Sequence, residues 1–407
     1  MTPVLATVSG VLERARADGV APALSAAVFA RGRLVHASWH GEVPDCQGGA
    51  PTRSARRGGA RRAPLHETDL FDVASLTKVM ATASLAAQLA DAGALDLDAP
   101  VAAALPGFER GGKETVTARH LLAHASGLPA LRPYHTLAAA DPSARACFLP
   151  PGPRPPFVSL AGPFVAGKAV VKAAVLAEPL EAAPSTRAVY SDVGFLALGF
   201  LVEALGGDLL SRLAARRVFG PLGLTSTAFV DGLDAGAAHA AYAGRAFAPT
   251  GWSEARGGIS QGLVNDDNAW AVGGGAGHAG VFSTAQEVAA FGQAWLEALA
   301  GGRSPVPADA AREFVRRDAA TPGSGRALGW DTPTGESSIG SRLGRGPKGA
   351  VGHLGYTGCS LWLDLDAEVA VAVLTNHVHP GGRADRPRML AFRRAVHDAV
   401  ADGLSIG

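Results

Sequence analysis

Apolar and polar positions alternate with two different periods near the start of the chain. Spacings of three and four predict an amphipathic helix with an apolar face of Val4, Val8, Val11, Leu12 and Ala15. Two apolar or alternating runs, Leu24 to Ala30 and Arg33 to Trp39, flank Arg31-Gly32 and predict a β-hairpin. Residues 41–66 are rich in Gly, Arg and Pro and show no period, so we expect a surface loop.

Helical periods dominate the middle of the chain, from Ser75 to about Ala215, and a Pro-rich stretch from Leu149 to Pro163 interrupts them. A further helix is predicted from Thr284 to Leu299. Two apolar runs near the end, Ser360 to Asp364 and Val369 to Leu374, predict strands. A last helix follows, with one apolar face of Met389, Phe392, Val396 and Val400.

This layout predicts an α+β fold. Strands from both ends of the chain complete one mainly antiparallel sheet flanked by terminal helices, and the long middle forms a large helical subdomain. We therefore expect a single domain over residues 1–407. Its sheet subdomain comprises residues 1–70 and 325–407, and its mainly helical subdomain comprises residues 71–324.

Composition narrows the function. Apolar residues make up 47% of the 407 residues, and 37 basic against 36 acidic residues leave a net charge of +1. This balance argues against nucleic acid or a membrane as a partner, and no run approaches the ~20 apolar residues of a membrane helix. Three scattered cysteines (Cys46, Cys147 and Cys359) and a first segment without an apolar signal core favour the cytoplasm. No pattern predicts the oligomeric state.

Ser75 and Lys78 are the first residues with candidate chemistry. The segment from Leu70 to Lys78 leads into an Ala-rich helix, so Ser75 is placed at a helix start and Lys78 one turn later on the same face. A serine hydroxyl needs a nearby base, and we expect partial burial to lower the pKa of Lys78 enough to help. Ser-x-x-Lys alone is a weak signal, because an N-cap serine followed by a solvent-exposed lysine has the same pattern.

Two further segments follow in a telling order. Val189 to Phe195 contains Tyr-Ser-Asp before an apolar helix, and Gly352 to Gly358 contains His-Leu-Gly before the terminal strands. The series Ser-x-x-Lys, Tyr-x-Asp, His-x-Gly resembles the serine β-lactamase and penicillin-binding-protein superfamily, in particular its class C, esterase and D-peptidase branch. Supporting stretches that look like that branch lie at residues 117–129, 219–224, 265–270 and 277–280.

The resemblance implies a β-lactamase/transpeptidase-like fold and catalysis through a serine acyl-enzyme. Ser75 would be the nucleophile, Lys78 its proton partner and Tyr190 the general base. The backbone N–H groups of Ser75 and Tyr356 would form the oxyanion hole, where each donor is typically worth about 10²–10³ in rate. A tyrosine in water ionises near pH 10, so Tyr190 needs a neighbouring cation, and Lys78 could supply it. No metal and no organic cofactor is implied.

Three substrate-binding positions depart from the pattern. His353 stands where relatives carry lysine, Leu354 where they carry Thr or Ser, and Asp192 where Asn is usual; Gly355 is kept. In those families the lysine and the hydroxyl hold the substrate carboxylate, whereas a neutral histidine and a leucine do not, and Asp192 would repel an anion. Two local interpretations stay open: a locally hydrogen-bonded loop histidine for His353, and a helix N-cap for Asp192.

We therefore expect a serine hydrolase for a small ester or amide, of the carboxylesterase or D-amino-acid amidase/peptidase type. A β-lactamase or penicillin-binding DD-carboxypeptidase is the alternative. A non-catalytic binding protein of the same fold is the second alternative. A small-molecule substrate is the one partner expected.

Other motif-like stretches are less specific. Gly258 to Gly262 matches Gly-x-Ser-x-Gly, but polar, glycine-rich residues precede it where that motif needs a buried strand, so we expect a loop. Gly275 to Gly280 matches a dinucleotide motif without a clear strand before it, so we expect its glycines to let backbone pass close to a neighbour. Gly162 to Ala169 is one residue short of a P-loop. His120 and His124 lack the glutamate of a zinc pair, so we expect helix-face or capping histidines.

Overall fold

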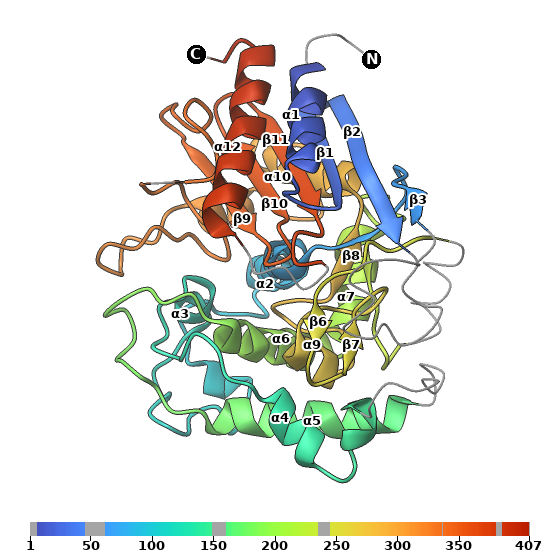
Figure 1. Cartoon of the computed structure of the whole chain (residues 1–407). Coiled ribbons are helices and arrows are strands. Elements are labelled where there is room, and N and C mark those ends of the chain that lie inside the picture. Colours follow the sequence, from blue (N-terminus) through green and yellow to red (C-terminus); the bar gives the residue numbers. More distant parts are fainter. Residues whose placement is uncertain are drawn as a thin grey trace.

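The computed structural model describes residues 6–44, 62–148, 160–234, 245–335, 337–379 and 385–406. Its main sheet has six strands in the order β3-β2-β1-β11-β10-β9, and all neighbouring strands are antiparallel. The strands are β1 (Ala23–Ala30), β2 (Arg33–Pro44), β3 (Arg62–Pro64), β9 (Ala350–Leu354), β10 (Ser360–Asp364) and β11 (Val369–Thr375). Because β1 pairs with β11, the two ends of the chain meet at the centre of the sheet (Figure 1).

The central strands of this sheet are buried on both faces. Alternate side chains of β11 enter two separate cores, with Val369, Val371 and Val373 in one and Ala370, Ala372 and Leu374 in the other. The terminal helices α1 (Ala6–Ala17) and α12 (Arg386–Gly403) lie side by side and cover the first face. Helix α10 (Ala285–Leu299) covers the second face. The terminal helices, the sheet and α10 thus form three layers (Figure 1).

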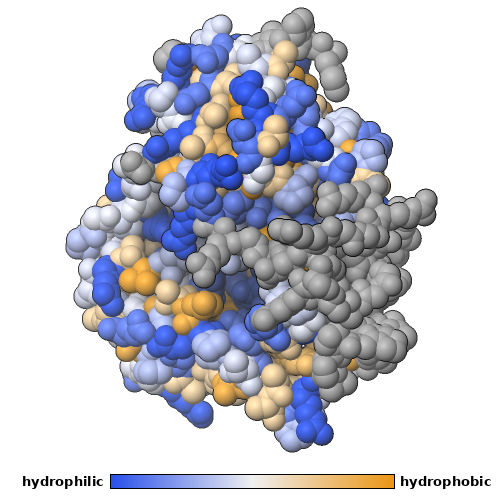
Figure 2. Space-filling view, in the orientation of Figure 1, coloured by the Kyte–Doolittle hydropathy of each residue, from blue (hydrophilic) through white to orange (hydrophobic). Residues whose placement is uncertain are grey.

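Most of the intervening chain forms a helical half below the sheet (Figure 1). Its longer helices are α5 (Ala161–Ala177) and α6 (Asp192–Gly206). The shorter helices are α2 (Ser84–Asp91), α3 (Ala118–Leu122), α4 (His135–Ala140), α7 (Leu210–Ala214), α9 (Asp267–Ala271) and α11 (Ala308–Val315). Helix α2 lies between the two halves (Figure 1). Figure 2 shows hydrophobic residues gathered on the helical half of the same face.

Helix α6 shows how local sequence sets these elements. The Ser191 hydroxyl accepts a hydrogen bond from the Gly194 N–H at 2.9 Å and caps the helix start. Gly207, in the left-handed region with φ 69°, ends the helix. All residues from Val193 to Val202 are buried, as expected for a helix that is apolar on every side. The helix is therefore the core of the lower half, and its N-terminus is fixed.

A small sheet leads the chain into the region between the halves. It has three strands in the order β4-β8-β5, namely β4 (Phe71–Asp72), β8 (Val281–Ser283) and β5 (Ala228–Phe229). A separate ribbon pairs β6 (Trp252–Ser253) with β7 (Gly258–Ile259). Single turns of tighter or wider helix are η3 (Ala74–Leu76), η4 (Lys78–Ala83), η5 (Val101–Ala103), η6 (Arg145–Phe148) and η8 (Ala215–Phe219). Ser75 is the middle residue of η3, directly after β4.

The predicted α+β architecture is confirmed, including the hairpin of β1 and β2 and the sheet built from both chain ends. The predicted surface loop over residues 41–66 is wrong at both ends, because β2 continues to Pro44 and pairs with β3. Residues 45–61 lie outside the described residues, as does most of the Pro-rich stretch. The subdomain limits at residues 70 and 325 stay a prediction.

Candidate active site

Ser75 sits on a turn that the neighbouring carboxylate of Asp72 holds in place. One Asp72 oxygen accepts from the Ala74 N–H at 2.8 Å, and the other accepts from the Asn265 N–H at 2.6 Å. Ala74 adopts φ 49°, a left-handed conformation that costs a residue with a Cβ about 1–2 kcal/mol. Burial is the main reason that the pKa of Asp72 rises to about 6, although both N–H bonds act against it. The backbone before Ser75 is therefore strained and braced.

Lys78 is fully buried, and three acceptors surround its ammonium group. Nζ donates to Ser75 Oγ at 2.9 Å, to Asp192 Oδ1 at 2.6 Å and to the His278 carbonyl oxygen at 3.3 Å. The Tyr190 phenol is a further hydrogen-bond partner of this ammonium group. Since Lys78 donates to Oγ, the hydroxyl hydrogen of Ser75 is left for another acceptor.

The expected lowering of the Lys78 pKa is wrong. Burial alone would lower it, but the Asp192 carboxylate and the Tyr190 phenol act in the opposite direction and together hold the pKa above its ordinary value. Lys78 is therefore a cation at neutral pH. The sequence predicts correctly that burial lowers the Lys78 pKa, but it does not predict the ion pair with Asp192 that helps to outweigh this effect.

Asp192 is the first residue of α6, and its neighbour Ser191 is the N-cap. The N-cap interpretation of Asp192 is thus off by one residue. The Asp192 side chain remains 22% exposed while that of Lys78 is 0% exposed, so the carboxylate is the solvent-accessible end of this ion pair. Because its charge is matched by Lys78 at 2.6 Å, Asp192 does not act as a free anion against a substrate.

Tyr190 lies among four side chains from separate elements. Lys78 Nζ is 4.8 Å from the centre of its ring, and Arg326 Cζ is 5.3 Å from it. The rings of His124 and His353 have their centres 4.6 Å and 6.0 Å away. The Ser75, Lys78 and Tyr190 segments that the sequence singles out are thus brought together, with two cations beside the phenol.

The strand position that departs from the family pattern is buried. His353 lies on β9 and is 1% exposed, so the loop-histidine interpretation is wrong about the element, although its Nδ1 does bond locally to the Leu354 carbonyl oxygen at 2.9 Å. Burial is the main reason that the pKa of His353 falls well below its ordinary value, and the charges of Lys78 and Arg326 add to this. His353 is therefore neutral, and it does not replace the positive charge of a lysine.

Gly355 follows β9 and passes close to the nucleophile turn. A Cβ at this position would lie 2.5 Å from the Val73 carbonyl oxygen, so no larger residue fits without movement. Leu354, the last residue of β9, is partly exposed and offers no polar atom on its side chain. The strand end and the turn that carries Ser75 are therefore packed backbone to backbone.

The backbone donors predicted to form an oxyanion hole belong to these two segments. The Gly355 N–H donates to the Cys359 carbonyl oxygen at 2.7 Å and closes a tight turn that contains Tyr356. The Thr357 hydroxyl ties this turn to the Asp72 carbonyl oxygen at 2.8 Å. Within the described chain, the N–H groups of Ser75 and Tyr356 have no protein acceptor. Both are free for a developing oxyanion, and their role stays a prediction.

The sequence does not assign site roles to several residues of this region, although Asp266 and His278 lie in stretches that support the resemblance and His124 is expected to be a helix-face or capping histidine. His124 is buried against Tyr190, and its Nδ1 accepts from the Ser191 N–H at 3.0 Å. Asp266 caps α9 and bonds the His278 ring at 2.9 Å; burial raises the pKa of Asp266, but the His278 contact outweighs it and holds the pKa below its ordinary range. Arg326 carries no motif in a chain rich in arginine, so no sequence signal points to it.

The competing motifs take other structural roles. Ser260 of the Gly-x-Ser-x-Gly stretch is buried after the short strand β7, with no helix directly behind it. A Cβ on Gly277 would lie 2.0 Å from the Phe195 carbonyl oxygen, so this glycine allows close backbone packing, as expected. The P-loop-like stretch lies inside α5. His120 forms a capping box with Thr117, which confirms a capping role.

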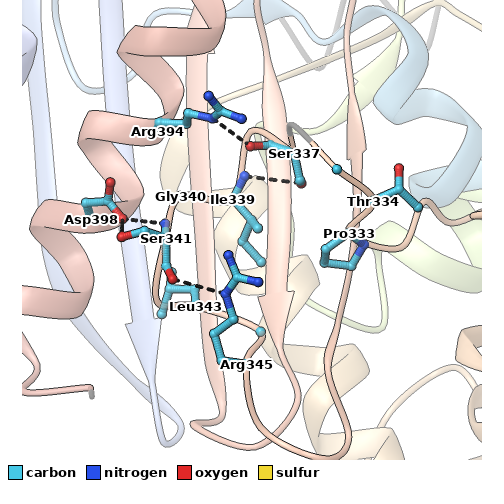
Figure 3. Close-up of a pocket in the computed structure, with 12 residues that line it drawn as sticks. Pro333, Thr334, Ser337, Ile339, Gly340, Ser341, Leu343, Arg345, Arg394 and Asp398 are labelled. Atoms are coloured by element: carbon cyan, nitrogen blue, oxygen red, sulfur yellow. Dashed lines mark hydrogen bonds between the residues drawn. The ribbon is translucent and has the colours of Figure 1, made fainter.

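A concavity lies on the side of the sheet covered by α12 (Figure 3) and has a volume of about 280 Å³. Its described lining includes Arg345, Arg394 and Asp398, with Ser341 donating to Asp398 at 2.9 Å. No lysine, histidine or tyrosine is among the described residues of its wall, so the Ser–Lys–Tyr arrangement around Ser75 is not repeated there.

No group of three or more His, Cys, Asp or Glu residues among the described residues is placed to hold a metal ion. No single helix in the described ranges is long and apolar enough to cross a membrane; one bent pair, Asp192–Gly206 with Leu210–Phe219, passes on length and composition alone.

Fold and sequence comparisons define the chain as a serine hydrolase of the β-lactamase-like type. It belongs to the Beta-lactamase family, whose profile matches residues 8–395. A Salmonella gallinarum (strain 287/91 / NCTC 13346) protein with the provisional name D-alanyl-D-alanine carboxypeptidase is 28% identical over 327 residues, which cover 76% of this chain and 70% of the relative.

Solved structures support the fold. A penicillin-binding protein homologue from Caulobacter crescentus superposes with a TM-score of 0.65 at 19% identity, over 98% of both chains. A family VIII carboxylesterase gives 0.63 at 18% identity over 98% of both chains. A class C beta-lactamase mutant gives 0.64 at 15% identity over 97% of both chains. The same fold is thus shared by relatives of different named activities.

Proposed function

We propose that the chain hydrolyses a small ester or amide through an acyl-enzyme on Ser75, as a carboxylesterase or D-amino-acid amidase/peptidase does. The observation that carries the proposal is the contact of Lys78 with Ser75 Oγ, made by a lysine that Asp192 holds in its charged form. Such a lysine orients the hydroxyl and offers positive charge, while the proton must leave to a different base.

Tyr190 is the base that this arrangement supports. In the first step, the Ser75 proton passes to the Tyr190 oxygen, and the bond from Oγ to the substrate carbonyl carbon forms. The Ser75 and Tyr356 N–H groups receive the carbonyl oxygen as its charge grows. The bond to the leaving alcohol or amine then breaks, and that group takes the proton from Tyr190. Water attacks the acyl-enzyme by the same path in reverse, so no step requires a metal or an organic cofactor.

The neutral His353 and the apolar Leu354 support a substrate that lacks a carboxylate beside the scissile bond. The Asp192 part of that argument is weaker than the sequence suggested, because Lys78 neutralises this carboxylate. A DD-carboxypeptidase activity is the second candidate, and the 28% identity with the Salmonella gallinarum protein favours it. We further infer a reducing compartment such as the cytoplasm, since Cys147 and Cys359 are free and buried.

Labelling with a fluorophosphonate probe tests the nucleophile. We expect Ser75→Ala to abolish labelling and Ser260→Ala, the matched control at the competing motif, to retain it. Labelling that persists in Ser75→Ala would contradict the proposal, and a wild-type protein that never labels would favour the non-catalytic binding protein. Turnover of p-nitrophenyl acetate, D-alanine p-nitroanilide and a chromogenic cephalosporin then ranks the substrates. Turnover of the cephalosporin alone would replace the proposal with a β-lactamase.

A further inference from the structure

Arg326 is a cation at the active site that no motif contains. It lies between α11 and β9 and forms an antiparallel bridge with Asp331, which in turn bridges to Gly352 on β9. These bridges fix Arg326 beside the strand that carries His353. Its guanidinium carbon lies 5.3 Å from the centre of the Tyr190 ring. Asp331 forms an ion pair with it, and the Arg326 side chain is 25% exposed.

The groups that face Tyr190 come from every element packed against it. Lys78 and Arg326 are the two cations, and Asp192 and Asp331 are their respective counter-ions. His124 and His353 are both neutral, because burial lowers the pKa of each well below its ordinary value. The positive charge beside the phenol therefore comes from Lys78 and Arg326.

The two cations contact Tyr190 in different ways. Lys78 donates to Ser75, Asp192 and the His278 carbonyl oxygen, and a hydrogen bond with the Tyr190 phenol is among the causes that raise its pKa. Among the described residues, Arg326 bonds a protein acceptor only through Nη1, to Asp331, although a guanidinium group carries five N–H donors. The Arg326 side chain thus keeps N–H donors that no described protein acceptor uses, and its guanidinium group lies over the Tyr190 ring.

We propose that Arg326 is a positioning residue that stabilises the ionised Tyr190 oxygen before it takes the proton of Ser75. The inference rests on the proposed function of Tyr190 as the base. The phenolate oxygen loses its charge when the Ser75 proton binds to it, and it regains the charge when that proton passes to the leaving group. A fixed guanidinium charge about 5 Å from the Tyr190 ring stabilises the phenolate form of Tyr190, which must be present at the start of each catalytic cycle.

The pH dependence of kcat/KM for p-nitrophenyl acetate tests this role. In Arg326→Gln we expect the acid limb to move to higher pH by about one unit, with a roughly tenfold loss of rate at neutral pH that closes at high pH. Arg326→Lys should recover part of the loss. Asp331→Asn, which removes the counter-ion, should move the limb the opposite way. A merely structural role would not move the profile in opposite directions.

The controls separate the possible failures. Arg317→Gln, at an exposed arginine of the same segment, should leave the profile unchanged. If wild type turns over and labels at Ser75 but neither Arg326→Gln nor Asp331→Asn moves the limb, the inference is overturned and the proposed function stands. If the loss in Arg326→Gln is confined to an anionic ester and absent for a neutral one, Arg326 binds substrate instead and the inference is also overturned. A wild-type protein without turnover overturns both.

Discussion

Removal of the Asp192 charge should destabilise the fold by an amount that depends on what replaces it. Lys78 is fully buried and its Nζ lies 2.6 Å from Asp192 Oδ1. The two groups therefore form an ion pair whose cationic end is buried. A hydrogen bond to a charged group contributes about 1.5–3 kcal/mol, and the amide of Asp192→Asn would still accept one from charged Lys78, so its cost is the lost attraction between the two charges. Asp192→Asn keeps an acceptor oxygen for Lys78 and should therefore cost about 1–2 kcal/mol.

Asp192→Ala should cost more, because it leaves the Lys78 ammonium group with two acceptors and no counter-ion. Breaking a buried pair from one side typically costs about 3–5 kcal/mol. The pKa of Lys78 is raised in the folded state, so the contribution of Lys78 to the free energy of unfolding is fully present below its unfolded-state pKa. That contribution is lost only as pH rises through the folded-state pKa. Measurements at pH 7 therefore report the whole effect.

Urea unfolding followed by tryptophan fluorescence measures both variants against wild type. Asp309→Asn is a matched control, since Asp309 pairs with Arg312 on the surface and is 92% exposed. It should show no measurable loss. Equal losses for Asp192→Asn and Asp192→Ala would refute the reasoning, because they would show that neither the charge nor the retained acceptor matters to Lys78.

Three further outcomes follow from the same contacts. Gly355→Ala places a Cβ 2.5 Å from the Val73 carbonyl oxygen, so we expect a loss of about 1–3 kcal/mol in unfolding free energy and a lower kcat. The control Gly162→Ala adds a Cβ in open space in α5 and should raise the unfolding midpoint. A lower midpoint for Gly162→Ala than for Gly355→Ala would contradict the packing argument. Because the pKa of Asp72 is raised to about 6, the unfolding free energy of wild type should fall by up to about 3 kcal/mol relative to Asp72→Asn as pH rises from 4 to 7. A difference between the two proteins in urea unfolding that stays constant with pH would disprove this. His353→Lys buries a third cation beside Lys78 and Arg326 and should lower the unfolding midpoint; adding Arg326→Gln should restore part of it, and strict additivity would exclude the charge conflict.

The elements that the sequence predicts well are those with a strong period and a local signal. The strands β10 and β11 are uninterrupted apolar runs, and α10 begins after a capping threonine, so both their type and their limits could be predicted. The strand β3 could not be predicted, because its three residues carry no pattern of their own and pair only through β2. Its existence depends on a tertiary contact.

The candidate site divides in the same way. Ser75, Lys78 and Tyr190 lie in short motifs whose order along the chain carries information, so their neighbourhood could be predicted. Arg326 reaches Tyr190 through the bridges of a loop to β9, which no spacing in the sequence encodes. The sign of the Lys78 pKa shift also depends on a residue more than a hundred positions away, whose contact with Lys78 the fold alone creates.

The substitutions at this site make sense as one change in charge placement. A superfamily member with lysine on the strand and asparagine after the tyrosine would have two lysines near the phenol and no carboxylate within the pair. Here the strand carries neutral His353, so it contributes no positive charge. Lys78 and Arg326 both remain beside Tyr190, each in an ion pair, with Asp192 and Asp331 respectively. The region therefore keeps cations beside Tyr190, and the strand ends in the partly exposed, apolar Leu354. Under the proposed function, we expect this arrangement to favour substrates without a carboxylate at that strand.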